Sequence, residues 1–373
     1  MAINKEQNKL NVPPLRFPEF HGEWEECKLG DIAEFSSVRV SSAKLDCKNY
    51  VSTENMLQDF QGVVEAKSVP NETNVISFTC GDILISNIRP YLKKIWKATF
   101  DGGCSSDVFV LHATDNVAKD YLHYAVANDK FISYVMSGAK GVKMPRGDKN
   151  QMRTYQLSLP SIQEQHKIAK LLTLLDERIA TQSKLIEKLE SLIKGLRVSL
   201  MQMENGNIVH LGEIARIYQP QTISSTELTE DGFLVYGANG IIGKYKQYNH
   251  KTEQICITCR GNTCGMVNYT KPMSWITGNA MVINTDEHQN KVCKRYLYHY
   301  LSAYNFNSII SGSGQPQIVR TPLEKLEITL PSIFDQEQKA MLLDRIQAKI
   351  EISNRVLNLY QEQKQYLLRQ MFI

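Results

Sequence analysis

The chain has 373 residues, 42% of them hydrophobic and 22% charged, which is enough apolar content for two or three domains with buried cores. No stretch approaches the roughly 18 consecutive apolar residues of a membrane helix, so we expect a cytoplasmic protein rather than a membrane protein. The eight cysteines are dispersed, which argues against a secreted disulfide framework. The formal charge of +4 identifies no partner by itself.

The first half of the chain predicts a mixed α/β domain over residues 21–158, after an N-terminal segment of residues 1–20. Short β-like runs such as "DILIS" and "VFVL" alternate with Gly, Asn and Pro turns, and "DYLHYAVANDKFISYVMS" has a helical pattern. Residues 86–97 carry four cations and no acid, and residues 138–153 carry five cations and one acid. Both runs are candidate phosphate-binding loops, although most such runs are merely solvated surface.

A long helix is predicted over residues 159–205. Ser161 followed by Glu164 forms a capping-box pattern, in which the serine hydroxyl and the glutamate carboxylate each accept a backbone N–H of the first turn. Ile, Leu or Met then recurs in alternating steps of four and three, except at Gln182, a pattern typical of a coiled-coil seam in which a polar residue fixes the register. The predicted seam consists of Leu172, Leu175, Ile179, Gln182, Ile186, Leu189 and Ile193.

The second half repeats this plan, with a mixed α/β domain over residues 206–329 and a helix over residues 330–373. The helix entry "LPSIQEQHKIAKLL" recurs 171 residues later as "LPSIFDQEQKAMLL", with Ser332 and Asp335 as a weaker cap. The markers "LGDIA" and "LGEIA" near the starts of the halves are offset by 182 residues instead of 171. The stretches between the repeated segments therefore differ in length by eleven residues between the halves. The second predicted seam consists of Leu343, Ile346, Ile350, Ser353, Leu357 and Tyr360.

Two copies of one unit in a single chain can pair about an internal pseudo-twofold axis. The sequence therefore predicts an α+β fold, in which two mixed α/β domains are joined by two long helices that form an antiparallel coiled coil. We expect the domains at opposite ends of a rod about 60 Å long, since roughly 40 helical residues rise about 1.5 Å each. The alternative, a coiled coil used only for homodimerisation, is less favoured because both seams occur in one chain.

Basic and amide side chains recur at two points in each half of the chain. One point follows a predicted strand, in "SNIRPYLKKIWK" and "TCRGNT", and the other precedes each long helix, in "SGAKGVKMPRGDKNQ" and "SGSGQPQIVR". Arginine and amide side chains can read base edges, whereas lysines more often meet phosphates; an ordinary surface ion pair is the competing interpretation. The candidate DNA contacts in these loops are Arg89, Tyr91, Lys93, Lys94, Lys143, Arg146, Arg260, Asn262, Gln315, Gln317 and Arg320.

Several fragments occur in a specific order along nearly the whole chain. They run from "PPLRFPEFHGEWEECKLGDIAEF" through "ILISNIRPYLKK" and both "LPSI" helices to "VYGANGIIGKY", "ITCRGNTCG", "WITGNAMVI" and "SGSGQPQI". Each fragment is weak alone, but with two halves and two long helices the chain resembles the specificity subunits of type I restriction–modification systems. The fragments add Asn239, Lys244 and Thr277 to the candidate DNA contacts.

The resemblance implies that each mixed domain is a target-recognition domain reading one part of a bipartite double-stranded DNA site, while the helices fix the spacer between the parts. It also implies that the helices dock two methyltransferase subunits and that restriction subunits join them. S-adenosylmethionine, ATP and Mg²⁺ are then expected on those partners and no cofactor on this chain. Two departures limit the transfer of residue roles from one half to the other. The second half lacks the proline-rich start of the first, "PPLRFPEF" at residues 13–20, which we call the preface. In addition, "KGVKMPRG" matches "GSGQPQI" poorly.

We find no catalytic site in the sequence. A methyltransferase would need an Asn-Pro-Pro-aromatic tetrad and a glycine-rich cofactor loop, and an ATPase would need a Walker lysine. Asp335 in "DQEQK" is explained by helix capping rather than by nuclease chemistry. Cys256 and Cys259 have a zinc-like spacing, with Cys264 nearby, but the first two would point to opposite faces of a strand and no fourth ligand is evident. We therefore expect reduced thiols and no metal.

Two hypotheses compete with a non-catalytic DNA-recognition subunit. A structural coiled-coil adaptor would bind DNA weakly and without sequence preference, even beside a methyltransferase. An autonomous DNA-modifying enzyme would require S-adenosylmethionine or a metal in the isolated chain. The missing motifs argue against the enzyme, and the basic, glycine-rich loops argue against the adaptor.

Overall fold

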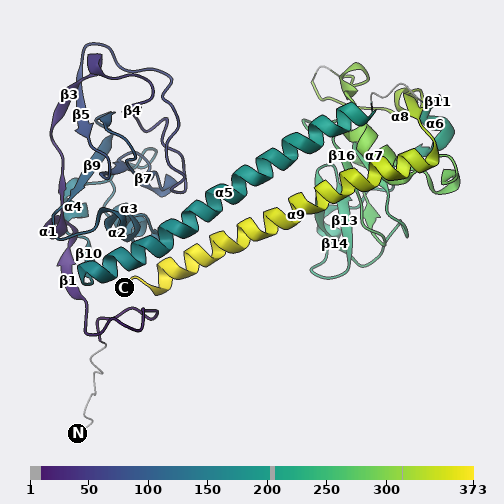
Figure 1. Cartoon of the computed structure of the whole chain (residues 1–373). Coiled ribbons are helices and arrows are strands. Elements are labelled where there is room, and N and C mark those ends of the chain that lie inside the picture. The colour runs from purple at the N-terminus through teal and green to yellow at the C-terminus, as the bar shows by residue number, and fades with distance from the viewer. Residues whose placement is uncertain (1–9, 202–205, 313) are drawn as a thin grey trace, which may run out of the picture. The chain divides into compact units, whose positions relative to one another are not determined.

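The chain divides into two compact units in the structure, a computed structural model that describes residues 10–201, 206–312 and 314–373. Unit 1 comprises Met1–Thr181 and Leu357–Ile373, and unit 2 comprises Gln182–Val356. Each unit contains one mixed α/β domain and part of both long helices, α5 (Ile162–Met201) and α9 (Ile333–Gln370) (Figure 1). Because this division falls inside both helices, the five sequence segments expected above remain predictions.

Unit 1 is built on two four-stranded sheets. One has the order β2-β9-β6-β7 and is antiparallel throughout, and the other has the order β3-β5-β8-β4, in which β4 and β8 are parallel. All four residues of β6 are buried. Ile83 and Ile85 share a core with Phe131 of α3, whereas Leu84 shares another with Phe78 of the second sheet. Burial on both faces explains why this strand is an uninterrupted apolar run.

The elements of unit 1 before α5 follow in chain order. They are β1 (Glu25–Lys28), α1 (Leu29–Ile32), β2 (Ala33–Phe35), β3 (Arg39–Ser41), η1 (Ser42–Lys44), β4 (Tyr50–Val51), β5 (Asn74–Phe78), β6 (Ile83–Ser86), η2 (Pro90–Leu92), β7 (Ile95–Lys97), β8 (Gly102–Cys104), β9 (Val108–Ala113), α2 (Lys119–Val126), α3 (Asp129–Ser137), α4 (Lys149–Arg153) and β10 (Gln156–Leu159).

Unit 2 repeats the first of these sheets in the order β12-β18-β15-β16, again antiparallel throughout. Its second sheet has three strands, β14-β13-β17, instead of four. The central strand β15 is buried on both faces, since Ile255 and Ile257 belong to one core and Cys256 to another. Each unit therefore has its own copy of the same four-stranded antiparallel sheet, which we call the main sheet. The different second sheets account for the unequal lengths of the two halves between the repeated segments.

The elements of unit 2 between the long helices also follow in chain order. They are β11 (Asn207–His210), α6 (Leu211–Ile214), β12 (Arg216–Tyr218), η3 (Ser225–Glu227), β13 (Phe233–Gly237), β14 (Gly240–Tyr245), β15 (Ile255–Thr258), β16 (Val267–Tyr269), β17 (Trp275–Ile276), β18 (Ala280–Asn284), η4 (Asp286–His288), α7 (Lys294–Ala303), η5 (Phe306–Ser308), α8 (Arg320–Glu324) and β19 (Glu327–Leu330).

The two long helices run antiparallel within each unit. In unit 1 the start of α5 packs against the end of α9, where Asp176 and Lys364 form an ion pair at 2.6 Å. In unit 2 the two polar seam residues meet, because Gln182 Nε2 donates to the Ser353 carbonyl at 3.0 Å. None of the predicted seam residues is fully exposed. Those that are buried are Leu172, Leu175, Ile186, Ile193, Leu343, Ile350 and Ser353, and those that are partly buried are Ile179, Gln182, Leu189, Ile346, Leu357 and Tyr360.

The helix caps are only partly as predicted. Ser161 Oγ accepts from the Glu164 amide at 3.4 Å, but the buried Glu164 carboxylate accepts two bonds of 2.8 Å from the Arg16 guanidinium instead of one from the serine amide. Arg16 comes from the proline-rich preface, which the second half lacks. At the second helix Ser332 Oγ accepts from the Asp335 amide at 3.1 Å and donates to its carboxylate at 2.6 Å. The Glu164 carboxylate thus binds an N-terminal arginine, whereas the Asp335 carboxylate binds the cap serine through its hydroxyl.

A glutamine in the first turn ties each long helix to its own α/β domain. Gln165 Oε1 accepts from the Ala118 amide at 2.9 Å, and Gln336 Oε1 accepts from the Cys293 amide at 2.8 Å. Both glutamines are 1% exposed. Ala118 and Cys293 immediately precede α2 and α7, so these two repeated residues fix the same joint in both units.

Candidate nucleic-acid interface

Two surface loops of unit 1 are held together by backbone hydrogen bonds. Residues 138–147 form a hairpin in which Lys140 and Arg146 exchange bonds of 3.0 and 2.9 Å. The loop that follows β6 docks on this hairpin, because the Arg89 amide donates to the Pro145 carbonyl at 2.8 Å and the Gly147 amide donates to the Asn87 carbonyl at 3.0 Å. We call residues 87–94 and 138–147 the paired loops of unit 1.

Unit 2 has the same pairing between residues 259–265 and 311–318, of which residue 313 lies outside the described residues. Ser311 and Gln317 exchange bonds of 2.9 and 2.8 Å. The Gly261 amide donates to the Pro316 carbonyl at 2.9 Å, and the Ile318 amide donates to the Cys259 carbonyl at 3.0 Å. These are the paired loops of unit 2.

The hydrogen bonds settle which loop residues correspond. Pro145 corresponds to Pro316, so "KGVKMPRG" and "GSGQPQI" occupy equivalent places although their sequences match poorly. The loops after β6 and β15 correspond, as expected from their positions just past a strand. Arg89 takes the place of Gly261, because both amides donate to the equivalent proline carbonyl.

Arg89 adopts a left-handed backbone conformation with φ of 51°, where unit 2 has Gly261 with φ of 83°. A side chain in this region costs of order 1–2 kcal/mol, which glycine avoids. Lys93, at the other end of the same turn, is also left-handed, and the turn is braced by the Phe60 amide, which donates to the Lys93 carbonyl at 2.9 Å. Strain retained at an exposed arginine favours a functional role for its side chain.

Most of the predicted DNA contacts in the paired loops lie on the surface, but several have partners within the chain. Lys93 pairs with Asp129 at 2.7 Å, and Arg146 pairs with Asp107 at 3.0 Å. These partly exposed pairs contribute little to stability and can exchange for phosphate. The predicted contacts classed as exposed are Arg89, Tyr91, Lys143, Arg146, Asn239, Arg260, Asn262, Gln315, Gln317 and Arg320.

Two predicted contacts have internal roles. Lys94 is partly buried, and its Nζ donates to the Thr53 carbonyl at 2.6 Å; burial, with the nearby Arg89 charge, lowers the pKa of its ammonium group. Thr277 is 2% exposed, and its amide bonds the Tyr236 carbonyl. The expectation that Thr277 contacts DNA is not supported, because the strand β17 leads it into the core, and Lys94 stabilises its own loop.

The remaining predicted residues of unit 2 lie outside its paired loops. Asn239 is in the turn between β13 and β14, next to Ala238, whose carbonyl accepts a hydrogen bond from the Thr258 hydroxyl at the end of β15. Lys244 of β14 is partly exposed and lies 3.5 Å from an Asp231 carboxylate oxygen. Arg320 starts α8 and pairs with a glutamate one turn later at 2.6 Å.

Sequence reasoning missed two features of the unit 1 hairpin. Lys140, whose side chain is 85% exposed, closes the hairpin as the partner of Arg146, and no local pattern marks it. Asp148 caps α4 directly after the hairpin, and the Gln151 and Asn150 amides that it accepts lower the pKa of its carboxyl. A cap at this point was detectable as an Asp before a short helical stretch.

The cysteines are arranged as expected from the strand pattern. Cys256 and Cys259 belong to different cores, and Cys259 Sγ contacts the Asn279 carbonyl at 3.2 Å. Burial raises the pKa of the Cys256 thiol far above its usual range. Over the described residues, no group of three or more His, Cys, Asp or Glu side chains is placed to hold a metal ion.

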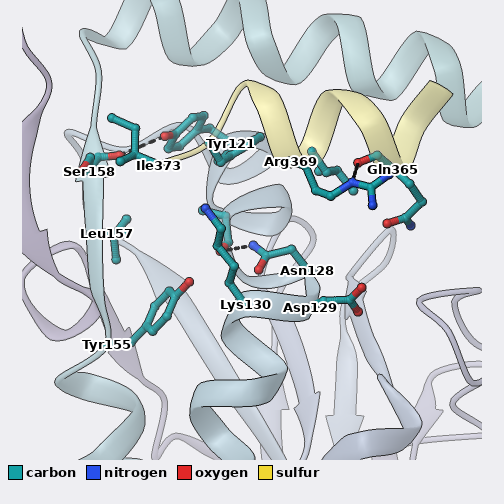
Figure 2. A pocket seen from close by; sticks show the side chains of 13 residues that line it. Tyr121, Asn128, Asp129, Lys130, Tyr155, Leu157, Ser158, Gln365, Arg369 and Ile373 are labelled. Atoms are coloured by element: carbon teal, nitrogen blue, oxygen red, sulfur yellow. Dashed lines mark hydrogen bonds between the residues drawn. The ribbon is translucent and has the colours of Figure 1, made fainter. Parts of the chain in front are cut away.

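A cavity of about 220 Å³ lies elsewhere in unit 1, between α2, α3, β10 and the end of α9 (Figure 2). Tyr121, Tyr155 and Phe372 contribute aromatic rings to its lining, which also includes Lys130 and Arg369. None of its lining residues belongs to the paired loops. Within the described part of the chain, no helix has the length and apolar character needed to cross a membrane.

Two α/β domains with the same main sheet and the same loop pairing, connected by two long helices, indicate the class of protein. The family model for the type I restriction modification DNA specificity domain matches residues 21–191 and again residues 203–360. The chain therefore belongs to this family, with two copies of the domain, and is a specificity subunit, the non-catalytic DNA-recognition component of such a system.

Named relatives and solved structures agree with this assignment. The chain is 24% identical over 415 aligned positions to the type I restriction enzyme MjaVIII specificity subunit of Methanocaldococcus jannaschii, covering 95% of this chain and 92% of that one. It is 32% identical to the Escherichia coli EcoprrI specificity subunit over 140 positions, covering 36% and 34%. In fold it is similar to a type I restriction-modification S subunit from M. genitalium, with a TM-score of 0.70, 16% identity and coverage of 97% and 99%.

Proposed function

We propose that the chain reads a bipartite double-stranded DNA site, one half through the paired loops of each unit. The observation that carries this proposal is the shared backbone pairing, which presents different exposed side chains at equivalent places. Both sets of loops contain side chains of the types that form hydrogen bonds with base edges. These are Arg89 and Arg146 in unit 1, and Arg260, Asn262 and Gln317 in unit 2. One backbone scaffold with two side-chain sets suits two different half-sites.

The helices α5 and α9 would fix the spacer between the half-sites and dock two methyltransferase subunits, which restriction subunits then join. Apolar side chains outside the seam support a docking role for the helices. The exposed examples on the two helices are Leu174, Leu185, Leu192, Ile352 and Leu359. S-adenosylmethionine, ATP and Mg²⁺ would be bound by those partners, where the chemistry takes place.

The test is to co-express the chain with the methyltransferase encoded beside it and to map methylated adenines across a host genome by single-molecule sequencing. A bipartite motif with a fixed gap is the expected result. A stable, active complex that methylates without any motif would contradict the proposal and favour the structural adaptor. Methylation by the chain alone would instead favour the autonomous enzyme.

The spacer role predicts a change in gap length when both helices are extended together. One heptad would be inserted between Gln182 and Ser183 and another between Ile352 and Ser353, beside the polar layer that joins the helices. Seven residues add about 10 Å, or roughly three base pairs, to the helix pair. The mapped motif should keep both half-sites and widen its gap, whereas an unchanged gap in an assembled complex would exclude the helices as the spacer.

A further inference from the structure

The hairpin of unit 1 presents apolar side chains within a cationic surface. Val142 is 100% exposed and Met144 is 47% exposed. Lys140 and Arg146 flank them, with side chains 85% and 52% exposed, and Lys143 lies between them in sequence. A partner for this hairpin therefore needs an apolar group close to negative charge.

The hairpin holds these side chains on a defined backbone. The paired bonds between Lys140 and Arg146 close it, and two further bonds, Arg89 to Pro145 and Gly147 to Asn87, attach it to the loop after β6. Gly141, with φ of 97°, permits the tight turn next to Val142. A two-stranded ribbon is narrow enough to enter the major groove of DNA, which is about 12 Å wide.

Thymine is the base that offers an apolar group in the major groove, its 5-methyl, within reach of phosphates on both sides. We propose that Val142 contacts the 5-methyl group of a thymine in the half-site read by unit 1, while Lys140 and Lys143 meet the flanking phosphates. This inference rests on the proposed function and adds to it the chemical feature that unit 1 recognises.

In the corresponding hairpin of unit 2, the position equivalent to Val142 is residue 313, a serine in the sequence that lies outside the described residues. Because Pro145 and Pro316 are equivalent, Gln315 is the counterpart of Met144 and Gln317 is the counterpart of Arg146. Both glutamines are exposed. Amide side chains form hydrogen bonds with base edges and gain nothing particular from a methyl group. Methyl recognition is therefore expected in one half-site and hydrogen-bond recognition in the other.

The experiment uses the complex of the full chain with its methyltransferase and duplexes containing the mapped target, at one fixed salt concentration. Each thymine of the target is replaced singly by uracil, which removes only the methyl group. Burial of a methyl-sized group contributes roughly 0.8 kcal/mol, so one replacement should weaken wild-type binding about four-fold. Val142→Ser should bind the thymine and uracil duplexes equally.

Val38→Ser is the matched control, because Val38 is 68% exposed in unit 1 and lies outside the paired loops. It should keep the wild-type ratio between thymine and uracil duplexes. Wild-type binding that is indifferent to every uracil, or a Val142→Ser complex that still prefers thymine, would overturn the inference. In both cases sequence-specific binding would persist, whereas loss of all sequence preference in the wild-type complex would contradict the proposed function itself.

Discussion

Unit 1 and unit 2 hold two surface loops together with the same backbone hydrogen bonds, but the loops carry different side chains. Unit 1 has a left-handed Arg89 where unit 2 has Gly261, and Met144 where unit 2 has Gln315. Backbone bonds require no particular side chain, so they persist while the exposed residues change. The comparison indicates that the main sheet and the loop pairing form a common scaffold on which the loop side chains vary, as the proposed function requires.

The units differ also in how they are completed beside the long helices. In unit 1 the preface and the end of α9 meet, since the Leu15 amide donates to the Gln370 carbonyl at 3.0 Å. The Phe372 ring stacks on Tyr121 with centroids 5.3 Å apart. Unit 2, in contrast, is one continuous segment of the chain, Gln182–Val356. Unit 1 is therefore completed by a segment that is distant in the sequence, the end of α9, whereas unit 2 is made of one segment.

The largest expected effect follows from removing the end of α9. Truncation after Tyr366 deletes Leu367, Leu368, Met371 and Phe372, all of which are buried in the core of unit 1. At about 1.5–3 kcal/mol for each buried side chain, the loss should exceed about 5 kcal/mol. Hydrogen exchange should show lost protection in α2 and β10 and retained protection in α7 and β19.

Deletion of Ile373 alone is the control, because this residue is 40% exposed, and it should leave exchange in both units unchanged. Equal loss of protection in α2 and α7 after the larger truncation would show that the end of α9 supports both units, contrary to the comparison drawn here.

Arg89→Gly separates the role of the side chain from that of the backbone. The variant places in unit 1 the residue type that unit 2 uses, so relief of strain should raise the free energy of unfolding by about 1 kcal/mol. If the guanidinium reads a base, affinity should fall by about 1–3 kcal/mol through one half-site only. Chemical denaturation and binding to target variants measure the two effects.

Arg39→Ala is the matched control, since Arg39 is an exposed arginine of β3 outside the paired loops. It should leave half-site preference unchanged, and Arg260→Ala should affect the opposite half-site. An Arg89→Gly variant that loses affinity equally for all sequences would assign this arginine to phosphate rather than to base contact.

Sequence periodicity predicted the long helices and their seam, because each seam position is fixed by residues three and four away. The arrangement of the paired loops could not be predicted in the same way, since it depends on contacts between residues that are distant in the sequence. The backbone hydrogen bond from Arg89 to Pro145 joins loops that are far apart in the sequence of unit 1. The Glu164 carboxylate accepts hydrogen bonds from Arg16, which is also distant in the sequence. Likewise, only the fold shows that Lys94 donates a hydrogen bond to the Thr53 carbonyl and that Thr277 is buried.

The smallest expected effect concerns the cavity of unit 1. Tyr121 and Tyr296 are equivalent, because their hydroxyls donate to the carbonyls of the matching residues Ser158 and Thr329, each at 3.1 Å. One turn later α2 has Ala125, which lines the cavity, whereas α7 has Tyr300, whose ring packs beside Tyr296 with centroids 6.1 Å apart. A missing aromatic ring therefore accounts for the cavity in unit 1.

Exchanging these two residues should change the stabilities of the units in opposite directions. Ala125→Tyr should occupy part of the cavity of about 220 Å³ and raise the free energy of unfolding by roughly 0.5–1 kcal/mol. Tyr300→Ala should lower that of unit 2 by about 1–2 kcal/mol, less than for a fully buried ring because this one is only partly buried. Hydrogen exchange resolves the two units. A destabilising Ala125→Tyr would show that the walls around Tyr121 and Phe372 are too close for the ring, so that the cavity belongs to the packing of α9 and not to the missing tyrosine.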